Sequence, residues 1–493
     1  MLDSVMEAVL GHWSWMPALS PSMTALIRIA LAALSLGFLA WSLPNWRRFF
    51  VCERWGGYVQ RSPLAEVLFS PAGSVLLGAA WAACQVALLM DLWTVWAALL
   101  NAVVCRILFI WTRWRSVGRG CGAPGFMTWW LSLSLFLVLF TERCAPQLSQ
   151  LALLVIQVDL AFIIASSGTY KCLNGYRIGE GMNYGMCNPM WGYWWRTMRR
   201  LSTRHPVFTL QNQAAWSSQL VAAALMLIPP TRWLGGALLA WSFVLILLQI
   251  RLGFLAEQMI VTGLFFATAG SPPDAAVGHL LPTPAPALTP APTWIVQAAG
   301  AWLWFHLLAI PLCHAALSWN FYGRRRLPEA LQWCIDRYTN FFGMLVWRVF
   351  TADLIDFVVH VRVPEASGQW RECTAWSPRH PRWWHVCESI TLTSLFTARR
   401  YWPENPELFQ ARLLRHARTV GPVVEYELEG LRQVEGRWTS EAVMRYRVEC
   451  AAGTVTETVL APWYSPTRVH RGSRVHGMSS RPGSYAPAAR TSS

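Results

Sequence analysis

Nine apolar stretches occupy most of the first two thirds of this 493-residue chain. Most are long enough to cross a bilayer as a helix, which takes about 17 to 25 residues. Inside a bilayer every backbone polar group must be satisfied by the protein, and a helix does this by itself. The sequence therefore predicts an all-α polytopic membrane bundle of about nine transmembrane helices, at residues 24–43, 72–90, 93–112, 126–141, 149–168, 214–230, 233–250, 253–270 and 294–317.

The composition points to the same class of protein. Hydrophobic residues make up 54% of the chain, and only 14% of residues are charged, against about 25% in soluble domains. The formal net charge of +15 comes from arginines beside apolar runs, which suits anionic lipid headgroups better than nucleic acid. The lipid bilayer is therefore the expected partner, and no binding of nucleic acid is expected. The 12 cysteines include no CxxC pair, so no metal site is expected.

The placement of arginine predicts the orientation of the helices. Arginines cluster after the first, third and fifth apolar runs and after the last one, whereas the alternate segments hold isolated arginines or none. Cytoplasmic segments carry the excess of basic residues, so the N-terminus is expected outside and the C-terminal region inside. The chain is thus expected to be a multi-pass protein of the cell membrane, with a cytoplasmic soluble domain.

The sequence divides into four segments. Residues 1–23 form an N-terminal segment with acidic rather than basic residues, unlike a secretory signal peptide. The transmembrane domain follows at 24–317. Residues 318–465 mix a helical pattern with segments of period-two alternation, which predicts a small soluble α+β domain. The tail at 466–493 is basic and polar and is expected to be disordered.

One residue type is nearly missing from the chain. Lys171, in "SSGTYKCLNGYRIGEGMNYG", is the only lysine, and every other strongly basic residue is an arginine. Arginine stays protonated in proteins, whereas lysine can lose its proton in an apolar site. Lys171 is therefore a candidate for a role that needs the neutral amine, as a base or a nucleophile. The alternative is that one lysine was left over in a chain rich in arginine.

The apolar runs also contain two carboxylic acids and two histidines. They are candidates because such residues at bilayer depth are costly and are usually paired or functional. Hydrogen bonding inside the bundle is the plainer interpretation, and a transporter that uses such residues is a further one. These residues are Asp159, Glu257, His306 and His314.

The segment "SGTYKCLNGYRIGEGM" resembles a segment of vitamin K-dependent γ-carboxylases and of their bacterial relatives, the horizontally transferred transmembrane domain family. In that pattern a glycine is followed by a lysine three residues later, an aromatic five beyond it and a glycine three further. Here these residues are Gly168, Lys171, Tyr176 and Gly179, and Glu180 follows. The resemblance extends over roughly residues 20–270, including "RIALAALSLGFLAWSLPNW" and "RLGFLAEQMIVTGLFF".

The resemblance implies a carboxylase-like transmembrane domain, an activity and, through the family's bacterial relatives, a bacterial inner membrane. In the family the matching lysine is the base that deprotonates a hydroquinone, so Lys171 would be that base and a reduced quinone the cofactor. The expected protein is a carboxylase-like lyase or an oxidoreductase that acts on a quinone-like or other lipid-soluble reactant and modifies a peptide or secreted protein.

The chain also departs from the family in two ways. Phe243 stands where the carboxylases have a histidine in a later span, and only His306 and His314 offer a substitute. The soluble domain is expected in the cytoplasm, whereas the carboxylases act on the opposite side of the membrane. A non-catalytic membrane partner for the maturation or export of a secreted peptide or protein is therefore the alternative function.

Overall fold

The computed structural model describes residues 16–278, 290–323, 325, 327–342, 344, 355–373, 385–401 and 405–464. The first 15 residues of the expected N-terminal segment and the expected disordered tail lie outside the described residues.

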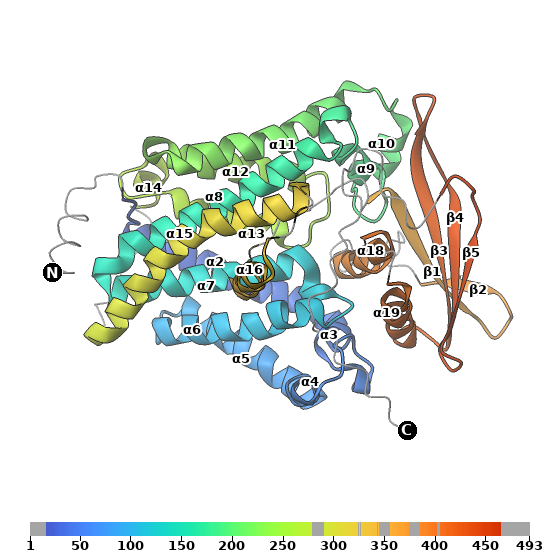
Figure 1. Ribbon diagram of the computed structural model, residues 1–493, viewed down its shortest axis with the longest axis horizontal. Coiled ribbons are helices and arrows are strands. Elements are labelled where there is room, and N and C mark those ends of the chain that lie inside the picture. The colour runs from blue at the N-terminus through green and yellow to red at the C-terminus, as the bar shows by residue number, and fades with distance from the viewer. Residues whose placement is uncertain are drawn as a thin grey trace.

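Within the described residues, seven helical segments are long and apolar enough to cross a membrane. Their length suits the roughly 30 Å hydrocarbon core, so they indicate a membrane protein. Figure 1 shows them side by side as a bundle. Their main helices are α2 (Pro21–Ser42), α5 (Pro71–Leu89), α6 (Thr94–Cys105), α7 (Gly122–Cys144), α8 (Ser149–Leu173), α12 (Arg232–Leu247) and α15 (Thr293–Gly323).

Two further helices correspond to the other expected spans. The helix α11 (Pro206–Leu227) has 22 residues but carries several amide side chains, and it is not one of the seven. The helix α13 (Leu255–Thr262) and the 3-10 turn after it form a shorter apolar segment, Leu255–Phe266, about 18 Å long at 1.5 Å per residue. All nine expected apolar runs are thus helical, and the count of nine crossings stays a prediction.

Short helices connect or flank the bundle helices. They are α3 (Trp46–Phe50), α4 (Pro63–Leu68), α9 (Met182–Cys187), α10 (Trp195–Arg200) and α14 (Pro272–Val277).

The expected alternation of the connecting segments is visible in their contacts. At the bundle end away from the sheet, the Ala269 N–H donates to the Ala18 carbonyl, and the Ala291 N–H donates to the Cys144 carbonyl. The arginine-rich segments after the first, third and fifth spans instead contact the soluble domain, for example through an Arg48–Glu388 ion pair. Arginine-rich segments and the sheet therefore lie at the same end of the molecule (Figure 1).

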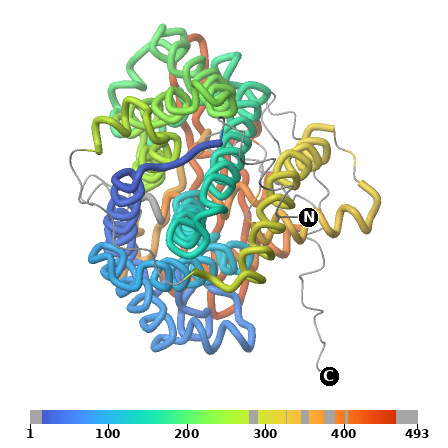
Figure 2. Tube along the Cα trace, turned by 90° about the vertical axis from the view of Figure 1, so that its left-hand side faces the viewer, coloured from blue at the N-terminus to red at the C-terminus, as the bar shows by residue number. Residues whose placement is uncertain are grey.

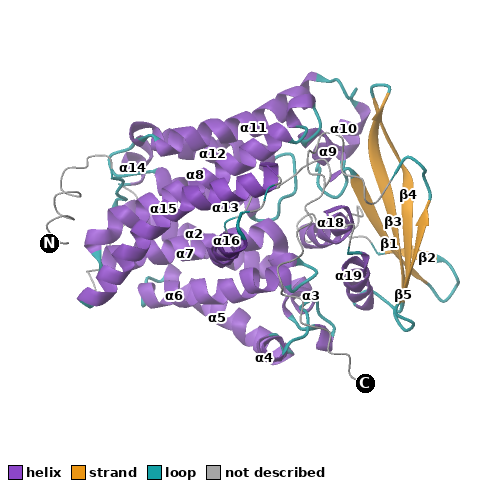
Figure 3. Cartoon of the chain, in the orientation of Figure 1, coloured by secondary structure: helices purple, strands orange, loops and turns teal. Residues whose placement is uncertain are grey.

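The C-terminal segment, predicted to be a soluble domain and referred to by that name, contains a five-stranded antiparallel sheet in the order β2-β1-β3-β4-β5. Two helices, α18 (His385–Tyr401) and α19 (Pro406–Arg418), lie between this sheet and the bundle (Figure 3). A further helix, α16 (Glu329–Phe342), lies beside the bundle. The expected α+β character is therefore confirmed, with strands β1 (Phe357–Pro364), β2 (Trp370–Glu372), β3 (Val423–Val434), β4 (Arg437–Glu449) and β5 (Thr454–Val459).

Alternating side chains give this sheet one apolar face, as a period of two residues requires. Tyr426 of β3 and Tyr446 of β4 are fully buried and contact Phe396 of α18. Phe409 of α19 packs against the same cluster. The aromatic cluster joins both helices to the sheet.

Figure 2 views the bundle from the end opposite to the sheet. The helix α8 runs through the middle of the bundle, and α15 lies at its edge (Figure 2). Burial agrees with these positions, because 72% of the α8 window is buried against 28% of the α15 window. The residues of α8 are thus enclosed by other helices, which places Lys171 inside the protein.

Candidate functional site around Lys171

Lys171 lies in the last turn of α8, at the end of the bundle that faces the soluble domain. Its side chain is buried, with 5% of the residue exposed. The Nζ atom donates to Gln219 Oε1 of α11 at 2.9 Å and to Ser167 Oγ at 3.4 Å. It also lies 6.0 Å from the centre of the Tyr176 ring.

Gly168 explains how α11 comes close enough to reach the lysine. A Cβ atom on Gly168 would lie 2.9 Å from the Leu220 side chain and 3.2 Å from the Leu220 backbone nitrogen. Only a glycine lets the two helices approach this closely without displacing one of them. Since Leu220 follows Gln219, the same close approach brings the Gln219 amide to the amine.

The turn after α8 depends on two glycines in left-handed conformations. Gly175 has φ +100° and Gly179 has φ +84°, values that favour glycine. The Glu180 N–H donates to the Gly175 carbonyl at 2.8 Å and closes the turn. Glu180 thus supports the motif through its backbone.

Tyr176 is held under this turn. Its residue is fully buried, and a Cβ atom on Gly181 would lie 2.5 Å from its ring. Burial raises the pKa of the Tyr176 phenol well above its ordinary value. The phenol therefore stays protonated at physiological pH. The aromatic residue expected at this position therefore lies next to Lys171. The motif residues form the end of α8 and the turn that follows it.

The surroundings of the amine are neutral. In the described part of the chain, its two hydrogen-bond acceptors are an amide and a hydroxyl oxygen, and no carboxylate forms an ion pair with it. A buried charge without a partner is costly. A neutral amine could donate to the two acceptors and keep its lone pair for a proton. The arrangement suits a base.

Two of the other candidate residues have partners of their own. Asp159 Oδ2 accepts a hydrogen bond from Trp130 Nε1 at 2.7 Å, as expected of a carboxyl group packed in a bundle. His306 Nδ1 is hydrogen-bonded to Tyr338 Oη at 2.5 Å, and its ring stacks on Trp302. Neither residue contacts the Lys171 amine.

Three of the four candidates keep a buried polar atom without a partner. Among the described residues, Asp159 Oδ1, Glu257 Oε2 and His314 Nε2 are buried and have no hydrogen-bond partner. The His314 ring lies 5.6 Å from that of Phe162. The structure therefore does not bring the four polar candidates together with Lys171 into one site.

Sequence reasoning missed Gln219, because a lone glutamine in the run "AAWSSQLVAAAL" gives no signal of its contact. It also missed a set of buried polar groups elsewhere in the bundle. Gln85 donates to Asn101, Asn101 to Ser132, and Gln258 to Thr128. These five residues line a small cavity between α2, α5, α6, α7 and α13. They mainly satisfy one another.

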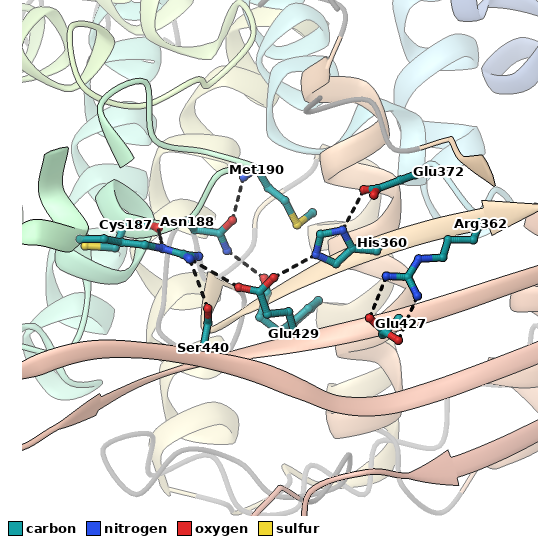
Figure 4. A network of polar contacts seen from close by, with 11 residues as sticks. Cys187, Asn188, Met190, His360, Arg362, Glu372, Glu427, Glu429 and Ser440 are labelled. Atoms are coloured by element: carbon teal, nitrogen blue, oxygen red, sulfur yellow. Dashed lines mark hydrogen bonds and ion pairs between the residues drawn. The ribbon is translucent and has the colours of Figure 1, made fainter. Parts of the chain in front are cut away.

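The chain beyond the motif is attached to the sheet (Figure 4). Asn188 Nδ2 donates to the carbonyls of Ile355 and Phe357, both at 2.8 Å. Arg199 Nε donates to the Cys187 carbonyl, and Arg199 Nη1 lies 3.5 Å from Glu429 Oε1 of β3. The soluble domain therefore holds the segment that follows Lys171.

His360 of β1 extends this network. Its ring lies between two carboxylates, with Nε2 3.0 Å from Glu429 Oε2 and Nδ1 2.8 Å from Glu372 Oε1 (Figure 4). Burial would lower the pKa of His360, but the two carboxylates raise it above its ordinary value. Burial would raise the pKa of Glu429, but His360, Ser440 and Arg199 lower it to about 2.

These shifts predict a pH-dependent stability. The contribution of His360 is complete below its unfolded pKa of about 6.5 and is lost as pH rises through the raised folded pKa. His360→Gln should therefore lower the melting temperature more at pH 6 than at pH 9. Thermal unfolding of both proteins at the two pH values measures this, and an equal loss at both would contradict it.

A buried polar cluster around His416 joins α19 to α18 and to strand β3. His416 of α19 is fully buried and is hydrogen-bonded to Tyr426 Oη at 2.7 Å and to Glu388 Oε1 at 3.0 Å. Burial would raise the pKa of Glu388, but His416 and Arg48 hold it below its ordinary value. Because Arg48 follows the first span, the cluster joins the soluble domain to the bundle. Its burial favours this structural role over catalysis.

Comparisons of the chain with protein-family models, with curated proteins and with solved structures find no match.

Proposed function

We propose that this chain is an integral membrane enzyme, similar to vitamin K-dependent carboxylases, in which Lys171 acts as a base on a quinone-like or other lipid-soluble reactant. The observation that carries the proposal is the only lysine of the chain, buried with neutral partners in a motif whose glycines and tyrosine form its surroundings. Arginine could not serve there, because it does not give up its proton.

The hydrogen-bond acceptors around Lys171 suit the deprotonation of a reduced quinone. When bound, it would supply an acidic hydroxyl group and two reducing electrons. Nζ would take the hydroxyl proton, and Gln219 Oε1 and Ser167 Oγ would accept hydrogen bonds from the ammonium that results. The Tyr176 ring would stabilise the same cation from its face. These groups are in place before the proton moves, as a base site requires.

The proposed location is a cell membrane, in bacteria the inner membrane, with the soluble domain in the cytoplasm. The arginine-rich segments lie at the end of the bundle that carries the sheet, and such segments stay in the cytoplasm. Lys171 is then near the cytoplasmic surface. A peptide substrate would reach it from that side.

Phe243 limits the reaction steps that can be proposed for this chain. It is a buried residue of α12, and its side chain has no titratable group, unlike the histidine that the carboxylases have at this position. His306 and His314 do not contact the amine, so they do not replace that histidine directly. The proposal is therefore confined to proton removal by Lys171, a step that carboxylation of a peptide would use.

The test is oxygen uptake by the purified protein in nanodiscs supplied with a reduced naphthoquinone. The wild-type protein should accelerate uptake over empty nanodiscs, and Lys171→Gln should remove the acceleration. Arg177→Gln is the matched control, because Arg177 is an exposed cation of the same turn. Equal rates for the wild type and Lys171→Gln would overturn the proposal.

The alternative, a non-catalytic partner for the maturation or export of a secreted peptide or protein, is supported by the edges of the sheet. Strands β2 and β5 are its outer strands and are largely exposed, and an extended peptide can add to such an edge. Normal function of Lys171→Gln in cells, with loss of function on changes in β5, would favour this alternative.

A further inference from the structure

The five polar side chains around the small cavity lie deep inside the bundle. Gln85, Asn101, Thr128, Ser132 and Gln258 are each between 1% and 4% exposed. A buried polar group is costly unless it finds a hydrogen-bond partner, and the lipid around a bundle cannot supply one. The partners of these side chains must therefore lie inside the protein.

Most of their hydrogen-bonding groups pair with one another or with the backbone. Gln85 Nε2 donates to Asn101 Oδ1 at 2.6 Å, and Asn101 Nδ2 donates to Ser132 Oγ at 3.0 Å. Gln258 Nε2 donates to Thr128 Oγ1 at 2.7 Å. The hydroxyl groups of Ser132 and Thr128 donate in turn to backbone carbonyls of α7, at 2.7 and 2.9 Å.

The side-chain oxygen of Gln258 is the exception. Among the described residues, Gln258 Oε1 is buried and has no hydrogen-bond partner. The nearby hydroxyl protons of Thr128 and Ser132 are already directed to carbonyl groups. A partner for Gln258 Oε1 must therefore bring a proton of its own to donate.

The size and lining of the cavity limit what this partner can be. The five polar residues line it together with Ser35 and four leucines. Its volume of about 10 Å³ is close to the roughly 10–15 Å³ that one water molecule needs, and an acyl chain or an organic reactant does not fit. None of the lining residues is charged, so an ion would lack a counter-charge. The cavity suits one small neutral molecule.

Water meets each of these conditions. Cavities that stay empty in proteins are lined by apolar side chains, whereas polar cavities of sufficient size hold water. A water molecule can donate to Gln258 Oε1 and form its other hydrogen bonds with the hydroxyl and amide groups of the lining. If the Gln258 amide were turned over, its Nε2 would face the cavity, and the same water would accept the hydrogen bond instead.

We propose that a single water molecule is bound in this cavity, where it donates a hydrogen bond to Gln258 Oε1. The water belongs to the folded bundle rather than to the solvent. It joins the short helix α13, which carries Gln258, to the other helices that line the cavity. This inference does not depend on the role of Lys171.

X-ray footprinting of the full-length protein in nanodiscs tests the proposal. An X-ray pulse splits water into hydroxyl radicals, which oxidise the side chains beside the water, and peptide mass spectrometry quantifies each site. Leu131 and Leu135 line the cavity and are 3% and 1% exposed, whereas Leu160 of α8 is 0% exposed and does not line it. The two cavity leucines should be oxidised at least about fivefold faster than Leu160, because radicals form beside a buried side chain only where water is bound.

Gln258→Met removes the amide oxygen but keeps a side chain of similar size, so it should lower the oxidation of Leu131 to the level of Leu160. Gln157→Met is the matched control, because Gln157 is also 1% exposed but does not line the cavity. The proposal is overturned if Leu131 and Leu135 are oxidised no faster than Leu160 in the wild type. It is also overturned if their fast oxidation persists in Gln258→Met.

Discussion

Lys171→Arg is expected to lower the rate of reduced-quinone-dependent oxygen uptake by about 10²- to 10⁴-fold, the usual contribution of a positioned base. The substitution keeps a cation at the end of α8 but removes the amine that can release and accept a proton. Oxygen uptake in nanodiscs, with the uncatalysed rate subtracted, measures the effect.

Two further variants separate loss of the base from loss of the fold. Lys171→Met removes the amine with a side chain of similar length and no charge, so it should fold and show the same loss. Gln219→Leu removes one hydrogen bond to Nζ, which is worth about 1 kcal/mol, and should slow the reaction only several-fold. Full activity of Lys171→Met with a normal melting temperature would rule out Lys171 as the base.

Asp356→Ala is expected to destabilise the soluble domain by about 3–5 kcal/mol, as when one partner of a buried ion pair is removed. Asp356 Oδ1 accepts a hydrogen bond from Arg400 Nη1 at 2.8 Å. The side chains of the pair are 11% and 3% exposed, so the variant leaves a guanidinium buried without its counter-ion. Thermal unfolding of the purified protein measures the loss.

Glu449→Ala is the control for this prediction. Glu449 forms an ion pair with Arg447 at 3.3 Å, but about half of each side chain is exposed. Exposed ion pairs contribute about 0–1 kcal/mol, so the melting temperature should hardly change. Similar losses in Asp356→Ala and Glu449→Ala would show that burial does not determine the strength of these pairs.

The spanning helices could be predicted from the sequence because length and hydropathy determine them. The run at 126–141 looked short, and the helix there extends over Gly122–Cys144. Polar residues obscured the start of α11, since Gln211, Asn212 and Gln213 lie in a helix that begins at Pro206. A hydropathy profile counts Asn212 and Gln213 as polar, although both form hydrogen bonds within the protein.

The soluble domain was less predictable. The strands followed from alternation, but α18 contains three threonines, an isoleucine and a valine, β-branched residues that favour strands. Packing overrides this preference, because Leu392 and Leu395 are buried and Phe396 joins the aromatic cluster of the sheet. Contacts between segments that are distant in the sequence thus determine that this segment is helical.

The candidate site also has a part that could be predicted from the sequence and a part that could not. The sequence identified Lys171 and the motif glycines, because a residue type used once and glycines at fixed spacing are visible in one dimension. Gln219 is 48 residues away on another helix, and only the crossing at Gly168 brings it to the amine. The two carboxylates beside His360 also depend on strand pairing, which cannot be read from a single stretch of sequence.

Because the chain has one lysine, incorporation of lysine labelled with ¹⁵N at Nζ gives a single side-chain signal, which Lys171→Arg would remove. Solid-state NMR of the protein in lipid at pH 7.5 then reports the state of that nitrogen directly. A chemical shift of a neutral amine is expected, because a base must be free to accept a proton. The shift of an ammonium ion at this pH would contradict the proposed role of Lys171.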